Sequence, residues 1–355
     1  MEAYYYGRMN KLHQNVYQSM KKGLTSLEDS FLIPRVEPGE MADIFFKLRL
    51  DCPEIFYAVN FKYRSYPDSG NLQILPEYLF DKGKVKEHQK AMTARVDKLV
   101  RQAKDLKEWE KEKFIHDFIC ENVHYDKLKK PYSHEIIGPL GHGVGVCEGI
   151  AKSVKILCDA LGIWCIIAIS EVNPEKKIKY RHAWNIVKIG GKTYHLDATF
   201  DNTISKNSRK NDTNTNSKNG KNSENEIRYD YFNLDDKSIF KDHEPVITPV
   251  PECSDHSHFY YLDKKMSFTK MEDVAKRSAQ AVKKGKRLTF HWRGGYLTRA
   301  VLDEILKTIQ QAAEEKGKYA RISLNWPQAV ISVDFITEME KEMVILEEAN
   351  EGEKE

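Results

Sequence analysis

A glycine-rich loop at residues 138–146 leads into a segment that begins at Cys147, and this junction constrains the fold more than any other part of the sequence. Apolar residues recur at helical spacing from residue 150 to 161, and Gly162 supplies a C-terminal stop. Three segments rich in β-branched and aromatic residues follow, at 164–170, 180–189 and 193–196. This order predicts a helix that packs against an antiparallel meander.

A two-residue turn sets the expected register of the last two strands. If Gly190-Gly191 forms that turn, Trp184 lies opposite Asp197. Side chains alternate between the two faces of a strand, so His182 and Asp197 become diagonal neighbours on one face. We therefore expect a hydrogen bond between them, which a register shift of one residue would prevent.

Cys147, His182 and Asp197 are the residue types needed for thiol nucleophilic catalysis. A helix N-terminus and a nearby imidazolium both favour the thiolate form of a cysteine. Asp197 would fix the tautomer of His182, and His182 would take the thiol proton. The backbone N–H of Cys147 could stabilise an oxyanion, and His134 and Tyr125 are candidate side-chain donors.

Three sequence blocks in this order resemble the transglutaminase-like superfamily of papain-fold cysteine enzymes: VCEGIA at 146–151, RHAWN at 181–185 and HLDATF at 195–200. The resemblance covers residues 122–245, and its last part is similar to bacterial members. It implies an α+β fold in which a helix bearing the cysteine packs on an antiparallel sheet bearing the histidine and aspartate. It also implies Cys147 as nucleophile, His182 as base and Asp197 as the residue that orients the base.

The length of 355 residues allows about two domains. We expect an N-terminal α+β region at 1–80 with a helix at 5–22 and strands at 54–59 and 72–75. The catalytic domain is expected at 81–250, with two helices between 82 and 121 and a disordered polar insertion at 203–226. A small C-terminal α+β domain is expected at 264–345, with helices at 271–284 and 297–315 and strands at 287–292, 319–324 and 329–335.

Several residues near the expected triad have more than one interpretation. Trp184 is expected in the core or in the wall of the site, and Glu148 either stabilises the helix start or influences the thiolate. His195 could replace His182 or support it. These histidines with Cys147 and Asp197 could ligate zinc, but they lack the local pairing typical of zinc sites.

Composition excludes several classes of function. The glycine loop matches neither of the two common glycine-rich phosphate-binding motifs, and a net charge of +3 does not indicate nucleic-acid binding. Six cysteines without close spacing indicate reduced thiols. We expect no cofactor or metal, no nucleic-acid or membrane partner, and a cytoplasmic location unless a leader has been removed.

The expected activity is acyl transfer at an amide bond of a protein or peptide substrate, through a thioester. Water as acceptor gives a protease, amidase or deamidase, and an amine gives a crosslinking transglutaminase. We favour hydrolysis because water is always present and no calcium loop of the EF-hand type is visible. A non-catalytic binding or scaffold module with this fold is the alternative from another class.

Overall fold

We describe the protein from a computed structural model, which describes residues 3–338 apart from 173, 176–180, 211–226 and 245–249. The chain divides into two compact units. Unit 1 holds residues 1–202 and 244–253, and unit 2 holds residues 203–243 and 254–355. Both units mix helices and strands, which confirms the expected α+β class. None of the helices in the described ranges combines the length and apolar character that a membrane span needs.

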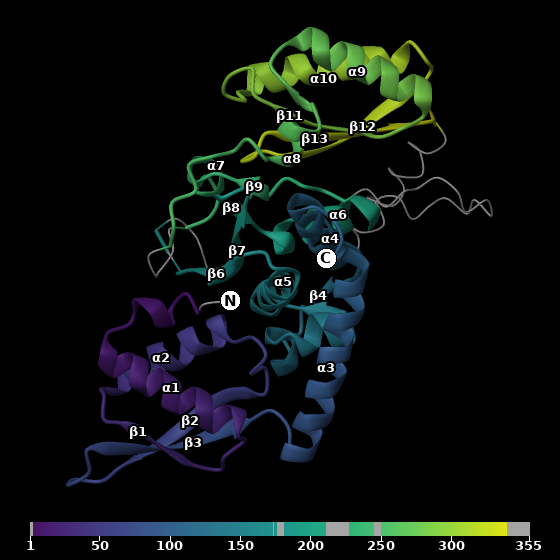
Figure 1. The fold of residues 1–355 in the computed structure, drawn as a ribbon. Helices are drawn as coiled ribbons and strands as arrows, with labels where there is room; N and C mark the ends of the chain where they lie inside the picture. The colour runs from purple at the N-terminus through teal and green to yellow at the C-terminus, as the bar shows by residue number, and fades with distance from the viewer. Residues whose placement is uncertain (1–2, 173, 176–180, 211–226, 245–249, 339–355) are drawn as a thin grey trace, which may run out of the picture. The chain divides into compact units, whose positions relative to one another are not determined.

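The first part of unit 1 is a three-stranded antiparallel sheet with helices beside it (Figure 1). Its strand order is β1-β3-β2, and α1 packs on α2 and β1. Asn10 caps α1 by accepting a hydrogen bond from the backbone N–H of His13. The elements are η1 (Tyr6–Arg8), α1 (Lys11–Thr25), β1 (Phe31–Pro34), α2 (Pro38–Asp51), β2 (Ala58–Ser65) and β3 (Asn71–Tyr78).

Two features of this part differ from the sequence expectation. The apolar residues at 55–57 are not in a strand, because they fill the core from a turn before β2 and are each about 1% exposed. β1 and α2 had no counterpart among the expected elements. α2 begins at Pro38, because proline is tolerated in the first turn of a helix. The side chain of Glu40 accepts a hydrogen bond from the backbone N–H of Glu37 at 3.1 Å.

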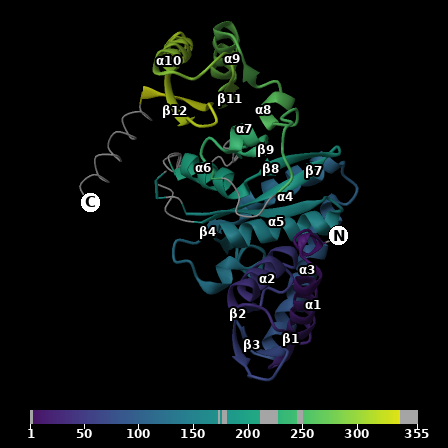
Figure 2. The ribbon, with the colours of Figure 1, turned by 90° about the vertical axis from the view of Figure 1, so that its left-hand side faces the viewer.

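Two helices follow, α3 (Lys82–Ala103) and α4 (Glu108–Asn122), in the region where two helices were expected. α3 is a long helix along unit 1, and α4 runs beside the next helix, α5 (Figure 2). Asp81 caps α3 by accepting from the N–H of Lys84 at 2.9 Å. Both helices bury one apolar face against α5, which explains their amphipathic pattern.

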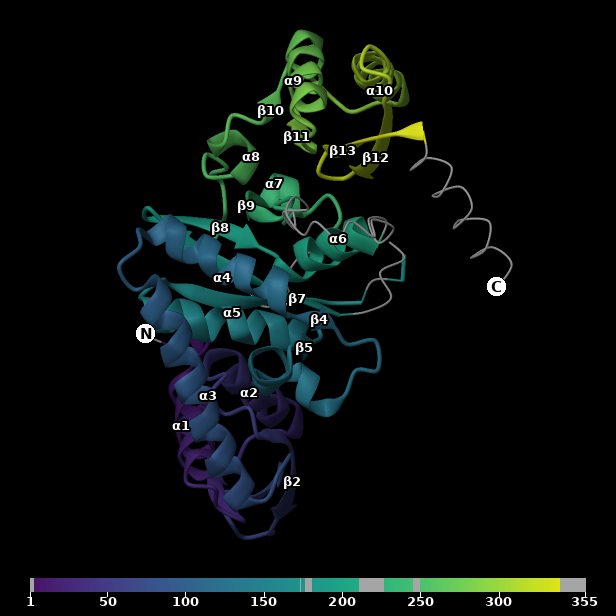
Figure 3. The same cartoon turned by 90° about the vertical axis from the view of Figure 1, so that its right-hand side faces the viewer.

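The cysteine-bearing helix and the meander have the expected form. α5 (Cys147–Leu161) ends at Gly162, whose φ of 80° lies in the left-handed region. Three antiparallel strands follow in order along the sheet, with α5 packed against the first two (Figure 3). Their bounds are β6 (Cys165–Ser170), β7 (His182–Ile189) and β8 (Lys192–Leu196).

The register of the hairpin agrees with the sequence prediction. Ile189 pairs with Lys192, and Asn185 pairs with Leu196. The two turn residues have positive φ angles, 59° at Gly190 and 82° at Gly191, as the favoured two-residue hairpin turn requires. β8 ends at Leu196, so the expected pair of Trp184 with Asp197 lies one step beyond the last pair of the ladder.

A helix, α6 (Ala198–Lys210), replaces the start of the expected disordered insertion. Residues 203–210 are therefore helical, and residues 211–226 lie outside the described part of the chain. The first turns of α6 are anchored, because Asp201 and Asn202 are buried and the side-chain amide of Asn202 donates to the backbone oxygens of Ile119 and Val123. Composition alone does not reveal this anchoring.

Unit 2 contains a four-stranded sheet of order β10-β11-β13-β12. Helices α9 and α10 pack on each other and against this sheet, as Figure 1 shows. The predicted helices and strands of this region are confirmed within three residues. The elements are β9 (Phe232–Leu234), α7 (Asp236–Ile239), α8 (Tyr260–Asp263), β10 (Ser267–Phe268), α9 (Met271–Lys284), β11 (Leu288–Trp292), α10 (Arg299–Glu314), β12 (Tyr319–Asn325) and β13 (Val330–Ile336).

Candidate active site

Cys147 is the first residue of α5, where backbone N–H groups have no partner within the helix. Of the six cysteines, Cys147 alone is half-buried, and the other five are buried. The partial positive charge of the helix N-terminus lies at this position. Cys147 is thus partly accessible and stands at the positive end of the helix dipole.

Close backbone packing holds the start of α5. The chain before it contains the short helical segments η2 (Pro131–His134) and η3 (Ile137–His142) and the strand β5 (Val144–Gly145). The N–H of Val146 donates to the backbone oxygen of Ser133 at 3.0 Å. A Cβ atom at Gly149, in the first turn of α5, would lie 2.2 Å from that same oxygen. Gly149 therefore serves close packing around Cys147.

His182 and Asp197 lie together as the register predicts. His182 is the first residue of β7, and its Nε2 atom lies 2.5 Å from Oδ2 of Asp197. Cys147 also acts on the ring of His182, because it raises the pKa of this residue. The structure thus places His182 against Asp197 and close to Cys147.

Asp197 has a second role in addition to its contact with His182. Its Oδ1 atom accepts hydrogen bonds from the backbone N–H groups of Thr199 at 2.8 Å and Phe200 at 3.1 Å, at the start of α6. The carboxylate is fully buried. Two backbone donors and the helix N-terminus favour its ionised form, so Asp197 can remain an anion next to His182.

The electrostatics of this pair favour a protonated histidine. Burial acts to lower the pKa of His182, but the charge of Asp197 and the hydrogen bond to it outweigh burial and raise the pKa to about 10. Cys147 adds to the increase. At neutral pH this shift favours the imidazolium form of His182.

Trp184 forms part of the wall beside His182. The two rings are nearly parallel, at 16°, with centroids 5.8 Å apart. The indole N–H of Trp184 donates to Nδ1 of His195 at 2.9 Å. Because an indole nitrogen is only a donor, Nδ1 of His195 carries no proton. His195 thus supports Trp184 and does not take the place of His182 in this arrangement.

Tyr125 is placed near Cys147 by a short parallel strand pair. β4 (His124–Tyr125) pairs with β5, so Tyr125 lies opposite Gly145, two residues before the cysteine. Burial raises the pKa of Tyr125, and the charge of Cys147 raises it further, which reflects their proximity. Tyr125 is 40% exposed, so its hydroxyl keeps access to solvent and to ligands.

Glu148 and His134 belong to a charged cluster under the first turns of α5. Lys152 is fully buried and contacts Glu148 at 2.8 Å and Glu135 at 2.9 Å. Arg49, from α2, pairs with both glutamates. His134 lies 3.4 Å from the second carboxylate oxygen of Glu148. No local sequence pattern indicates this cluster, because its members are spread over more than 100 residues.

The charged cluster determines the state of Glu148. Burial acts to raise the pKa of Glu148, but Lys152, His134 and Arg49 hold it well below its usual range. Both carboxylate oxygens contact these partners. Glu148 therefore links α5 to α2 and to the loop before it, which corresponds to the expectation that it stabilises the helix start.

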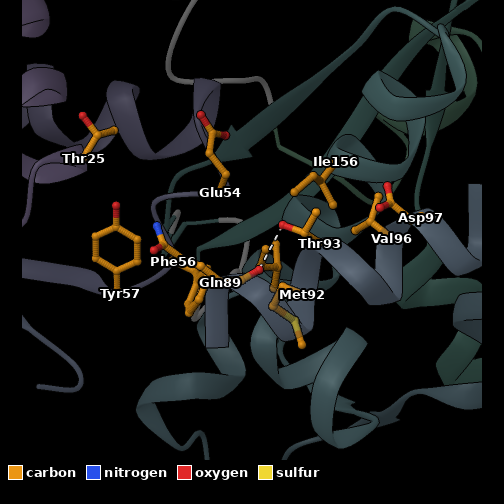
Figure 4. Close-up of a pocket in the computed structure, with 11 residues that line it drawn as sticks. Thr25, Glu54, Phe56, Tyr57, Gln89, Met92, Thr93, Val96, Asp97 and Ile156 are labelled. Atoms are coloured by element: carbon orange, nitrogen blue, oxygen red, sulfur yellow. Dashed lines mark hydrogen bonds between the residues drawn. The ribbon is translucent and has the colours of Figure 1, made fainter. Parts of the chain in front are cut away.

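A cavity of about 250 Å³ in unit 1 lies away from this site (Figure 4). Its walls come mainly from α3 and from the segment before β2, and α5 contributes Ile156. Its polar groups are in part bonded internally, since Thr93 donates to the backbone oxygen of Gln89 at 3.0 Å. The lining includes none of the three residues Cys147, His182 and Asp197.

The chain is similar to a known family and to several solved structures. Residues 93–198 match the family model of the Transglutaminase-like superfamily. Among solved structures, a TGase shares 12% identity over 40% of this chain and 44% of its own, with a TM-score of 0.26. A protein of Cytophaga hutchinsonii described as a candidate cysteine protease shares 21% identity over 40% of this chain and 62% of its own, with a TM-score of 0.24.

A third structure is that of menin, which reveals the binding site for Mixed Lineage Leukemia (MLL) protein. It shares 15% identity over 65% of this chain and 52% of its own, with a TM-score of 0.25. The chain thus spans less than two thirds of the length of each of these proteins. No curated protein matches the chain.

The family match contains Cys147, His182 and Asp197, and it supports a cysteine enzyme with the papain-like fold. From residue 93 to 198, this chain carries a domain of the transglutaminase-like superfamily.

Proposed function

We propose that the protein is a cysteine-dependent acyl-transfer enzyme that acts on an amide bond of a protein or peptide. The observation that carries this proposal is the contact of His182 with Asp197, close to Cys147 at the start of α5. Exposure of Cys147 supports it further, because the other five cysteines are buried. A fold used only for binding does not need this combination.

In the first step, the Cys147 thiolate attacks the amide carbonyl carbon. A carbon–sulfur bond forms, and the carbonyl π electrons move to the oxygen. The imidazolium of His182 then gives its proton to the amide nitrogen, the carbon–nitrogen bond breaks, and ammonia or an amine leaves. The product of this step is a thioester on Cys147, with neutral His182 next to Asp197.

The oxyanion of the tetrahedral intermediate needs donors that are already in place. We assign this role to the backbone N–H of Cys147, at the helix N-terminus, and to the hydroxyl of Tyr125. The strand pairing of β4 with β5 supports Tyr125, because it fixes the backbone of this residue beside the nucleophile. His134 is the weaker candidate, since it contacts Glu148.

In the second step, water attacks the thioester carbonyl carbon and gives one proton to His182. The carbon–sulfur bond breaks and the acid leaves, which restores the Cys147 thiolate and the His182 imidazolium. A primary amine in place of water would form a new amide, as in crosslinking. We propose hydrolysis as the main reaction, because the half-buried Cys147 is open to water, which is always in excess. The substrate then belongs to the protease, amidase or deamidase class.

Incubation of the whole protein with peptide mixtures, with and without a primary amine, tests the proposal. Mass spectrometry distinguishes cleavage, the small mass gain of deamidation and an amine adduct. Cleavage or deamidation without adduct supports hydrolysis, and adducts that replace both support crosslinking. Cys147→Ala is the control, and identical spectra for wild type and this variant would contradict all three reactions.

A further inference from the structure

Two aromatic rings contact the imidazole of His182, and one of them belongs to Phe200, which no sequence pattern marks as a site residue. The ring of Phe200 lies 4.9 Å from the His182 ring, measured between centroids, at an angle of 64°. The other ring is that of Trp184, on the same strand as His182. Edge-to-face contacts at such distances are favourable and hold the two rings in a defined orientation.

Phe200 also contacts Asp197, through its backbone. Its N–H donates to Oδ1 of Asp197 at 3.1 Å, while Oδ2 of the same carboxylate holds Nε2 of His182. One residue therefore touches both members of the His182–Asp197 pair. The helical backbone at the start of α6 connects the two contacts, so neither can shift without the other.

We propose that Phe200 is a positioning residue that fixes the ring orientation of His182 and shields the His182–Asp197 hydrogen bond from water. The proposal rests on the proposed function, because it assigns Phe200 a role in preparing the Cys147 nucleophile. Rotation about the bond that joins the ring to the His182 side chain has only a weak intrinsic preference. Contacts on the ring faces and edges must therefore supply the orientation.

The charge state of His182 supports a role for shielding. Burial acts to lower its pKa and Asp197 raises it to about 10, so attraction to Asp197 exceeds the cost of burial. Within unit 1, the titratable groups that act most strongly on this ring are Asp197 and Cys147. Water that reaches the pair weakens charge interactions, because the local dielectric constant rises. Loss of the Phe200 ring then leaves a less firmly held imidazolium beside the thiol.

The test is the rate at which iodoacetamide alkylates Cys147 in the whole folded protein, at pH 6 and pH 10. Phe200→Leu is expected to lower the rate at pH 6 about tenfold, the change that one pKa unit produces. At pH 10 ordinary thiols are ionised, and the variant should react as fast as the wild type. Phe200→Tyr keeps the ring and should stay within about twofold of the wild type at both pH values.

Two further variants guard against a general structural effect. Phe200→Met keeps much of the volume without the ring, and it serves if Phe200→Leu does not fold. Phe61→Leu is a matched control, because Phe61 is a half-buried aromatic residue on β2 of the same unit. Circular dichroism checks that each variant is folded. Peptide mapping confirms that Cys147 is the residue alkylated.

The outcomes separate the proposal from the function on which it rests. A slow reaction at pH 6 in Phe200→Leu or Phe200→Met, with normal Phe200→Tyr and Phe61→Leu, supports the role of Phe200. Wild-type rates in the ringless variants, or equal losses in Phe61→Leu, overturn it. A wild-type Cys147 that reacts at pH 6 no faster than an ordinary thiol overturns the proposed function itself, and the role of Phe200 with it.

Discussion

Unit 1 contains two groups made of a cysteine, a histidine and an aspartate, and they differ in almost every physical respect. One is Cys147 with His182 and Asp197, and the other is Cys120 with His116 and Asp201. In the second group all three side chains are fully buried. The comparison shows that residue types alone do not make a thiol site.

The use of the two imidazole nitrogens also separates the groups. In His182 the Nε2 atom faces Asp197, and Cys147 also acts on the ring. In His116 the Nε2 atom faces both Asp201, at 3.0 Å, and Cys120, at 3.7 Å. The Nδ1 atom of His116 lies 3.4 Å from Asp117. His116 is thus held between two carboxylates and has no ring nitrogen left to take the proton of Cys120.

The electrostatics of the buried group fit a structural ion pair. Burial acts to lower the pKa of His116, but Cys120, Asp117 and Asp201 raise it well above its usual value. Burial also raises the pKa of Cys120, which keeps that thiol protonated. His116 therefore acts as a cation that ties α4 to the start of α6. Because α6 begins next to Asp197, the buried group supports the position of the accessible one.

The largest expected difference is between the two cysteines. Cys147→Ala should abolish the activity found with peptide substrates, by about 10³-fold or more, because no other thiol is accessible. Cys120→Ala should leave kcat/KM within about threefold, since it removes only a buried thiol. Steady-state kinetics on both variants makes the comparison, and activity retained in Cys147→Ala would remove the basis for distinguishing the groups.

The two aspartates should differ in what their loss affects. Asp197→Asn should lower kcat by about 10²- to 10⁴-fold, because an amide cannot favour the imidazolium or the required tautomer. Asp201→Asn should instead lower the free energy of unfolding by about 3 kcal/mol, because it removes the nearer of the two anions that hold buried His116. Urea unfolding and kinetics on each variant test this, and equal kcat losses in both would contradict it.

Tyr125 should contribute less than the triad residues. Tyr125→Phe removes the proposed oxyanion donor but keeps the ring, so kcat should fall by about 10²-fold. The free energy of unfolding should change by less than about 1 kcal/mol, because the hydroxyl is close to solvent. Wild-type kcat in this variant would exclude Tyr125 as donor, and His134→Asn would then become the next variant to measure.

The smallest expected effect is a displacement of the alkaline limb of activity. The pKa of His182 is raised from its ordinary value near 6.5 to about 10. The stabilisation that depends on its proton is therefore complete below pH 6.5, and it is lost as the pH rises through about 10. Activity that needs the imidazolium should therefore decline near pH 10. In Asp197→Asn the residual activity should decline at lower pH, and a pH profile of kcat/KM that is identical in both proteins would contradict this assignment.

Much of the fold was predictable because local patterns agree with the tertiary structure. The helical spacing before Gly162 and the Gly190-Gly191 turn are local signals, and they specify α5, the hairpin and its register. The turn determines which residues pair, so it also predicts the proximity of His182 and Asp197. In contrast, residues 55–57 have the apolar pattern of a strand but lie in a turn. The pattern misleads because a buried turn requires the same apolar residues as a buried strand.

The tertiary structure alone decided which polar residues meet. Packing that no local pattern specifies brings Arg49 and Lys152 into the charged cluster and the ring of Phe200 against His182. α6 extends through polar residues because Asn202 anchors it to α4. Apart from the motif around Cys147, no sequence pattern distinguishes this cysteine from Cys120. What the sequence determined by itself is the proposed nucleophile, the helix that carries it and the hairpin, because these depend on residues close along the chain. Burial, ring contacts and charge pairing depend on distant residues, and only the folded chain brings these together.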